Sequence, residues 1–246
     1  MTVQFLSRSH LSLFRKQNKS RLQCIVFDMD DTLYLERDYV RSGFLHVGAL
    51  VERKLGVSGF SDVAWELFEN GQRGDIFDRT LSRIGLSGSN CLVRELVEAY
   101  RNHRPDIALA ADALECLRIF RPEYQLGLIT DGPTASQENK ASALQLDRWI
   151  DFQILTGRWG VGFYKPHPRS FLTMQEQTGT SGSECMYVAD NPSKDFTAPI
   201  KLGWTTVRIR RDNGLHSQIA SRDTELHYEL KDLSGLKQIL AMNSTL

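Results

Sequence analysis

Two carboxylates follow directly on an apolar run near the start of the chain. The run is Ile25-Val26-Phe27, and Asp28 and Asp30 come after it. In an extended chain, residues two apart point to the same side, so we expect these acids to lie close together. Close like charges resist joint ionisation, and a hard cation such as Mg²⁺ would relieve their repulsion. The alternative is a solvated acidic loop, whereas a calcium-binding EF-hand is excluded because Leu33 stands where that loop requires glycine.

Three further polar motifs occur along the chain, two of them directly after apolar runs. They are Thr130-Asp131-Gly132 after residues 126–129, Lys165 before Pro166, and Asp190, Asn191 and Asp195 after residues 186–189. In an open parallel sheet, ligands bind beyond the carboxyl ends of the strands. A threonine hydroxyl, a glycine that allows close backbone approach and a lysine would all suit an anion there. Each motif alone is also compatible with an ordinary turn or surface segment.

In this order, the four motifs resemble the signatures of the haloacid dehalogenase-like (HAD) superfamily. The resemblance implies that Asp28 is the nucleophile and becomes an aspartyl-phosphate, and that Asp30 is the general acid/base. It also implies a Mg²⁺ site formed by Asp28, Asp30 and Asp190. True dehalogenases of the superfamily lack the second aspartate because no alkoxide leaving group needs a proton. Asp30 therefore favours phosphoryl transfer over carbon–halogen cleavage.

The same resemblance implies roles for the later motifs. The residues implied to bind the substrate phosphate are Thr130, Asp131, Gly132 and Lys165. Lys165 would also neutralise the nucleophile, Asp195 would support the acidic cluster or this lysine, and Asn191 would add a ligand through water. Ala189 stands where the family usually has glycine, which leaves the carboxylates intact. A looser resemblance, over residues 100–105 and 227–230, is to the N-acylneuraminate-9-phosphatase-like branch.

The elements that must position these residues alternate between strands and helices. Near-continuous apolar or β-branched runs predict strands at residues 24–27, 126–129, 152–155, 186–189 and 205–209. Helical patterns lie between them at residues 113–120, 134–146, 169–178 and 195–202. The alternation predicts an α/β fold, a Rossmann-like parallel sheet with helices on both faces. Thr134 with Gln137 fits a capping box at the start of the helix after the second strand.

One interval breaks this alternation. Four helical stretches without a convincing strand occur at residues 39–55, 61–72, 76–84 and 92–103. An inserted helical domain is the economical explanation, and it is similar to the helical cap of the HAD superfamily. We therefore expect a basic amino-terminal segment at 1–19, an α/β core at 20–36 and 106–246, and a helical cap at 37–105.

The composition excludes several classes of partner. The chain has 30 Lys and Arg against 30 Asp and Glu, whereas a nucleic-acid-binding protein usually carries a basic excess. No apolar run approaches the ~18 residues needed to cross a bilayer, so no membrane partner is expected. The four cysteines are widely spaced, which predicts free thiols and a cytoplasmic location. No sequence feature indicates the oligomeric state.

These observations together predict a Mg²⁺-dependent phosphatase acting through an aspartyl-phosphate intermediate. Its substrate would be a small phosphorylated metabolite of the sugar phosphate or nucleotide class. Two alternatives stay open. A phosphomutase would use the same core and return the phosphate to the substrate. A non-catalytic HAD-like binding or regulatory module would keep only the fold, and the basic segment 1–19 is the sequence feature that hints at a partner for it.

Overall fold

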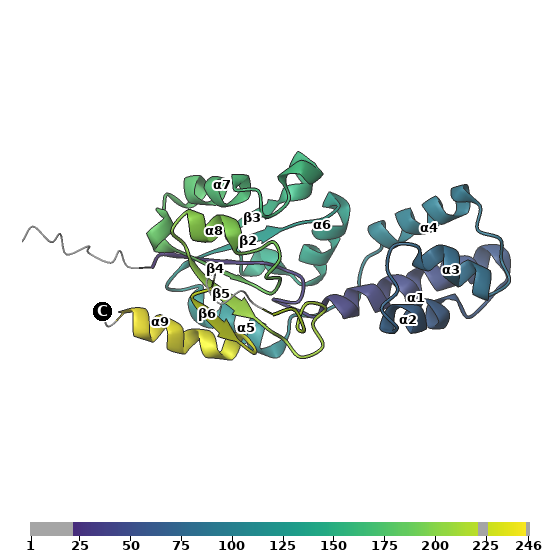
Figure 1. Cartoon of the computed structure of the whole chain (residues 1–246), viewed down its shortest axis with the longest axis horizontal. Helices are drawn as coiled ribbons and strands as arrows, with labels where there is room; N and C mark the ends of the chain where they lie inside the picture. The colour runs from purple at the N-terminus through teal and green to yellow at the C-terminus, as the bar shows by residue number, and fades with distance from the viewer. Residues whose placement is uncertain (1–21, 221–225, 245–246) are drawn as a thin grey trace, which may run out of the picture.

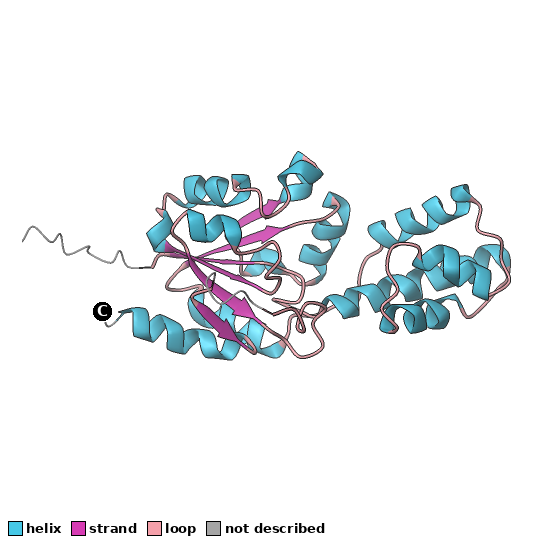
Figure 2. Ribbon diagram, viewed as in Figure 1, coloured by secondary structure: helices cyan, strands magenta, loops and turns pink. Residues whose placement is uncertain are grey.

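The computed structural model describes residues 22–220 and 226–244, so the predicted basic segment 1–19 lies outside the described residues. Within them, six strands form one parallel sheet (Figure 2). The order of the strands in the sheet is β3-β2-β1-β4-β5-β6. The strands are β1 Cys24–Phe27, β2 Gln125–Thr130, β3 Phe152–Leu155, β4 Cys185–Ala189, β5 Thr205–Ile209 and β6 Tyr228–Leu230. The predicted parallel sheet of the α/β fold is confirmed. Strand β6, which pairs with β5, was not predicted, because three residues are too few to stand out as an apolar run.

Helices cover both faces of the sheet because side chains alternate between the faces along each strand. Ile25 and Phe27 pack against α5 (Ala111–Phe120), the end of α6 (Thr134–Ala143) and α9 (Leu236–Ser244). Cys24 and Val26 point the other way, toward α7 (Arg169–Thr178) and α8 (Thr197–Lys201). Figure 1 shows α7 and α8 above the strands and α5 and α9 below them. Strands buried on both faces read as continuous apolar runs, which is why the sequence predicted them well.

Four helices form a separate bundle beyond one end of the sheet (Figure 1). They are α1 Glu36–Leu55, α2 Phe60–Glu69, α3 Ile76–Arg83 and α4 Asn90–Asn102. The bundle has its own core, in which Phe44, Phe60 and Leu81 are almost completely buried. This is the predicted inserted helical cap. Helix α1 begins at Glu36, one residue before the predicted cap boundary, and the exact division of the chain into domains stays a prediction.

Short 3-10 helices complete the described structure, at Leu146–Arg148, Thr156–Trp159, Val161–Phe163, Gly182–Glu184 and Leu233–Gly235. The capping box predicted at the start of α6 is wrong. Pro133 occupies the N-cap position, and no side chain caps the helix. The Gln137 side chain instead accepts a hydrogen bond from the Thr130 hydroxyl at 3.1 Å, because α6 packs beside the end of β2.

The described residues contain no helix that combines the length and the apolar character needed to cross a membrane. All four cysteines are free thiols, as predicted. Three of them, Cys24, Cys116 and Cys185, are buried, and Cys91 is exposed at the start of α4.

Candidate active site

The predicted polar motifs meet at the carboxyl edge of the sheet. From β1 the chain continues to β2 and β3 on one side, whereas β4 lies on the other side of β1. Ligands of open α/β sheets bind where the strand order reverses in this way. Asp28 directly follows β1, Thr130 ends β2 and Asp190 directly follows β4. These three residues line a cavity of about 320 Å³, together with Asp30 and Asp131.

The amine of Lys165 lies between two buried carboxylates. It is 2.5 Å from Asp28 Oδ1 and 2.8 Å from Asp195 Oδ1, and it donates a hydrogen bond to the Tyr187 hydroxyl at 2.9 Å. Burial by itself would lower the pKa of Lys165, but the charges of Asp195 and Asp28 outweigh burial and raise it well above its ordinary value. The lysine therefore stays charged. Tyr164 and Pro166 flank it in the chain, outside any regular helix.

The structure brings three carboxylates of the predicted set within reach of one cation. Oxygen atoms of Asp28, Asp190 and Asp195 all lie within 4.8 Å of one another, and all three residues are buried. Burial raises the pKa of Asp28 to about 8 even though Lys165 acts in the opposite direction. Burial also raises the pKa of Asp190. Burial thus disfavours the ionised form of both carboxyl groups, which a bound cation would restore, and their hard oxygen donors fit Mg²⁺.

Asp195 has less freedom than the other two acids. Its Oδ2 accepts a hydrogen bond from the backbone N–H of Asn191 at 2.9 Å, while Oδ1 faces Lys165. The Asn191 side chain turns to its own loop, where Oδ1 accepts from the backbone N–H of Ser193 at 3.0 Å. Asp28 and Asp190 therefore have the freer oxygens for a metal ion.

The Asp30 side chain turns away from this acidic cluster. Lys140 donates to both of its oxygens, at 2.8 Å and 3.0 Å, and the Tyr34 hydroxyl donates to Oδ1. Burial would raise the pKa of Asp30, but its pairing with Lys140 and Tyr34 lowers it overall. Neither of the possible metal-ligand groups found among the described residues includes Asp30. The predicted metal-binding role and the predicted acid/base role of this carboxylate thus both stay predictions.

The loop after β2 is held by contacts to the Asp131 carboxylate. Thr156 Oγ1 donates to Oδ1 at 2.8 Å, the backbone N–H of Lys165 donates to the same atom at 3.2 Å, and Lys194 donates to Oδ2 at 3.0 Å. Gly132 has φ +133°, a left-handed conformation that favours glycine. A Cβ there would come within 2.5 Å of the Gln137 amide. The loop therefore keeps the backbone beside Thr130 open to the cavity.

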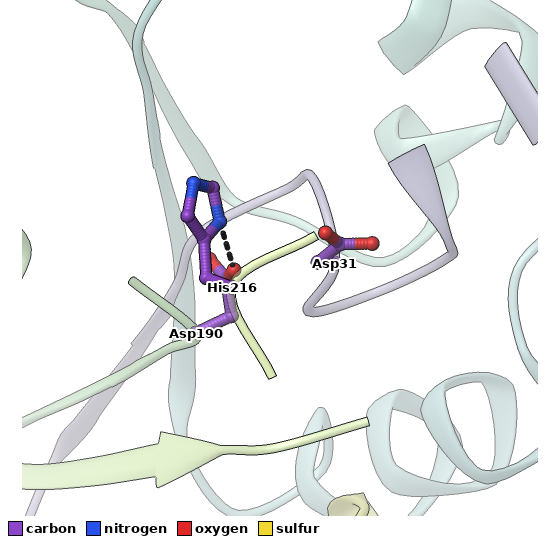
Figure 3. A group of neighbouring side chains, drawn as sticks. All are labelled: Asp31, Asp190 and His216. Carbon is purple, nitrogen blue, oxygen red and sulfur yellow. Dashed lines mark hydrogen bonds and ion pairs between the residues drawn. The ribbon is translucent and has the colours of Figure 1, made fainter. Parts of the chain in front are cut away.

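His216 approaches the site from a loop after β5 (Figure 3). Its Nδ1 lies 2.8 Å from Asp190 Oδ2, and its Nε2 lies 3.0 Å from the Asn191 amide. The hydrogen bond to Asp190 raises the pKa of His216. Asp31 lies beside Asp190 and His216, and its carboxylate accepts hydrogen bonds from the backbone N–H groups of Glu36 and Leu215. Asp31, Asp190 and His216 form the second group of possible metal ligands among the residues described.

Sequence reasoning missed several residues that contact the predicted site. They are Tyr34, Gln137, Lys140, Thr156, Lys194 and His216. The sequence carries a signal for two of them. Gln137 and Lys140 are three residues apart, so they are two polar side chains on one face of the helix that follows Thr130-Asp131-Gly132. No comparable signal marks His216, which is 26 positions from Asp190.

A second cavity, of about 670 Å³, connects the site to the cap. Both cavities share Glu36, Tyr100, Arg101, Lys194 and His216. The cap contributes mainly apolar side chains to the second cavity, among them Phe44, Phe68, Phe77, Val93 and Val97. Ligand sites are commonly apolar in this way, with a few polar groups that fix orientation.

Comparison with known proteins decides the family. The family model of haloacid dehalogenase-like hydrolases matches residues 25–209. The chain belongs to this family. The matched region begins inside β1 and ends with β5, so it contains all four motifs of the predicted site and the inserted helical cap.

Relatives of this HAD-like hydrolase include curated phosphatases. It is 27% identical over 201 residues to a glyceraldehyde 3-phosphate phosphatase of Methanopyrus kandleri, covering 77% of this chain and 84% of the relative. It is 26% identical to the protein of that name from Pyrococcus furiosus, covering 89% and 93%. The crystal structure of a HAD phosphatase from Thermococcus onnurineus superposes with a TM-score of 0.59 at 27% identity, covering 89% of this chain and 98% of that one. The finer resemblance to the N-acylneuraminate-9-phosphatase-like branch stays a prediction.

Proposed function

We propose that this chain is a Mg²⁺-dependent phosphatase that hydrolyses a small phosphomonoester through an aspartyl-phosphate on Asp28. Family membership and four relatives named glyceraldehyde 3-phosphate phosphatases support hydrolysis of a phosphoric monoester. The observation that carries the proposal is the buried group in which Lys165 contacts Asp28 and Asp195, with Asp190 beside them. Burying several charged groups together carries a desolvation cost, and groups with strongly shifted pKa values of this kind cluster at functional sites.

The first half of the reaction transfers the phosphoryl group to the protein. A carboxylate oxygen of Asp28 attacks phosphorus, the bond between phosphorus and the ester oxygen breaks, and that oxygen takes a proton from Asp30. Asp30 enters this step protonated, because the negative charge of the bound phosphate would raise its pKa. The positive charge of Lys165 offsets the repulsion between the anionic phosphate and the nucleophile; at about 4 Å and an effective dielectric near 20, each pair of unit charges costs about 4 kcal/mol. The Thr130 hydroxyl and backbone N–H groups of its loop would bind the phosphate oxygens.

The second half regenerates Asp28. A water molecule attacks phosphorus, gives its proton to Asp30, and the bond between phosphorus and Asp28 breaks to release orthophosphate. One residue can transfer the proton in both directions. Asp28 and Asp190 would hold Mg²⁺, which when bound supplies positive charge to the phosphate oxygens and favours the ionised form of the nucleophile.

The cap would contact the part of the substrate that leaves with the ester oxygen. The second cavity adjoins the catalytic one and is more than twice its volume, about 670 Å³ against about 320 Å³. A sugar phosphate or a nucleotide would place its phosphate beside Asp28 and its body against the cap. The named activity of the relatives makes glyceraldehyde 3-phosphate the first compound to test.

A phosphate-release screen tests the proposal. The purified full chain is assayed with Mg²⁺ against a panel of metabolites that includes glyceraldehyde 3-phosphate, other sugar phosphates and nucleotides. We expect orthophosphate release that stops with chelator and returns when Mg²⁺ is added back. Activity that ignores chelation would contradict the metal assignment. Isomerised phosphate without orthophosphate would support a phosphomutase, and no conversion of any phosphoester would support a non-catalytic module.

A further inference from the structure

Lys140 on α6 is a buried amine that the mechanism above does not use. Its side chain is only 4% exposed, and its amine contacts both oxygens of Asp30, at 2.8 Å and 3.0 Å. The same amine lies 4.1 Å from the centre of the Tyr39 ring. A buried charge is retained only when it is paired, and here the partner is the carboxylate proposed to transfer protons.

Helix α6 holds Lys140 in place through contacts of its own. Ser136 Oγ donates to the backbone carbonyl of Arg101 at 2.9 Å. The Asn139 side-chain amide donates to the carbonyls of Asn102 and His103, both at 3.1 Å. The helix is therefore tied to the end of α4, where the chain returns from the cap to the core. The position of the Lys140 amine is set by these contacts and by Tyr39, and does not depend on Asp30 alone.

We propose that Lys140 is a positioning residue that holds the Asp30 carboxylate in one orientation for its proton transfers. The inference rests on the proposed phosphatase function. Among the residues that the structure describes, two side-chain donors hold Asp30, the Tyr34 hydroxyl on Oδ1 and the Lys140 amine on both oxygens. Without Lys140, the Tyr34 hydroxyl is the side-chain donor that remains among these described residues, and the carboxylate gains freedom to rotate about its side-chain bonds.

Orientation matters because proton transfer requires hydrogen-bond reach, about 2.6–3.2 Å between heavy atoms. A displacement of about 1 Å in an active site can cost about 10²-fold in rate. The cost depends on the leaving group. An alkyl phosphate releases a strongly basic alkoxide that needs the Asp30 proton as its bond to phosphorus breaks. 4-Nitrophenyl phosphate releases a weakly basic phenolate that leaves without it.

The test compares these two kinds of ester in Lys140→Met, which keeps the length of the side chain and removes its charge. The value of kcat/KM reports the steps up to phosphoryl transfer to Asp28. We expect kcat/KM to fall about 10²-fold for the best alkyl phosphate of the panel and less than about 10-fold for 4-nitrophenyl phosphate. Lys140→Arg should recover part of the loss for the alkyl ester, because a guanidinium can also bind both carboxylate oxygens.

Two controls separate positioning from a structural role. Lys201→Met removes an exposed lysine at the end of α8 and should leave both kcat/KM values unchanged. In an Asp30→Asn background, Lys140→Met should cause no further loss, because residues that act as a unit are not additive. Additive losses, or equal losses for the two esters, would overturn the proposal.

A folding defect would not leave the question open. If circular dichroism shows that Lys140→Met is unfolded, the ratio of the two kcat/KM values is measured in Lys140→Gln. This variant keeps the polarity of the side chain, but its amide is uncharged and ends one bond short of the lysine amine. A ratio unchanged from the wild-type protein would contradict positioning. Wild-type protein that hydrolyses neither ester would instead refute the proposed phosphatase function, so the two failures are distinguishable.

Discussion

The edge of the sheet and the face of the cap opposite it are built from different kinds of side chain. At the sheet edge, buried charges are paired at short distances, as Lys165 is with Asp28 and Asp195. On the cap side, aromatic and aliphatic side chains such as Phe68 line a larger cavity. Fixed charges stabilise one distribution of charge in a transition state, whereas an apolar wall selects substrates by size and shape. The contrast predicts that chemistry and substrate choice can be altered separately in this molecule.

The largest expected effect comes from changing the nucleophile at the sheet edge. Asp28→Asn keeps the shape of the side chain, but an amide cannot form the aspartyl-phosphate. We expect kcat to fall at least about 10⁴-fold, in line with losses of other catalytic nucleophiles. Phosphate release measures the effect, and circular dichroism shows whether the fold is kept. Turnover close to that of the wild-type protein would remove Asp28 from its role and end the contrast between the two regions.

The same substitution has a second effect, on stability in the absence of metal. Burial raises the pKa of Asp28 from 3.8 to about 8, so between these values the folded protein holds a proton that the unfolded chain releases. This contribution to stability is complete below pH 3.8 and is lost as the pH rises through about 8. Asp28→Asn removes it. The free energy of unfolding of the variant, relative to wild-type protein, should therefore rise by about 1 kcal/mol per pH unit across this interval.

Urea unfolding in the presence of chelator measures this difference. Wild-type protein and Asp28→Asn are compared at several pH values between about 5 and about 8. Comparing the two proteins cancels the contributions of buried acids that do not interact with Asp28, such as Glu36, whose pKa burial raises to about 7. A stability difference that does not change with pH would contradict the buried, metal-free environment of Asp28.

The smallest effect is expected on the cap side. Arg101 is exposed on α4 and lines both cavities, so its guanidinium can contact the substrate without taking part in bond breaking. We expect Arg101→Ala to raise KM about 10-fold with less than about 3-fold change in kcat, the pattern of lost uniform binding. Arg94→Ala, on the same helix but not among the residues that line these two cavities, serves as the matched control. A kcat loss as large as that of a sheet-edge variant would break the comparison.

Prediction from sequence was most successful where a local pattern carries the information. The strands buried on both faces stand out as apolar runs, and Asp28, Thr130 and Asp190 follow or end them. Prediction failed where a contact joins distant segments. Nothing near Asp30 indicates that Lys140, 110 residues away, donates to both of its oxygens. The capping box at α6 failed for a related reason, because Gln137 has a tertiary partner in Thr130.

Three features could be predicted from the sequence alone: the order of strands and helices, the insertion of a helical cap and the presence of acids at the strand ends. These follow from periodicity and from residue types within a few positions, which act through local backbone geometry. Which partner each acid contacts depends on the tertiary structure. It placed Asp28 and Asp195 against Lys165, turned Asp30 toward Lys140, and brought His216 to Asp190. Such pairings depend on how helices and loops pack on the sheet, because electrostatic contacts form between groups that are close in space and not in sequence.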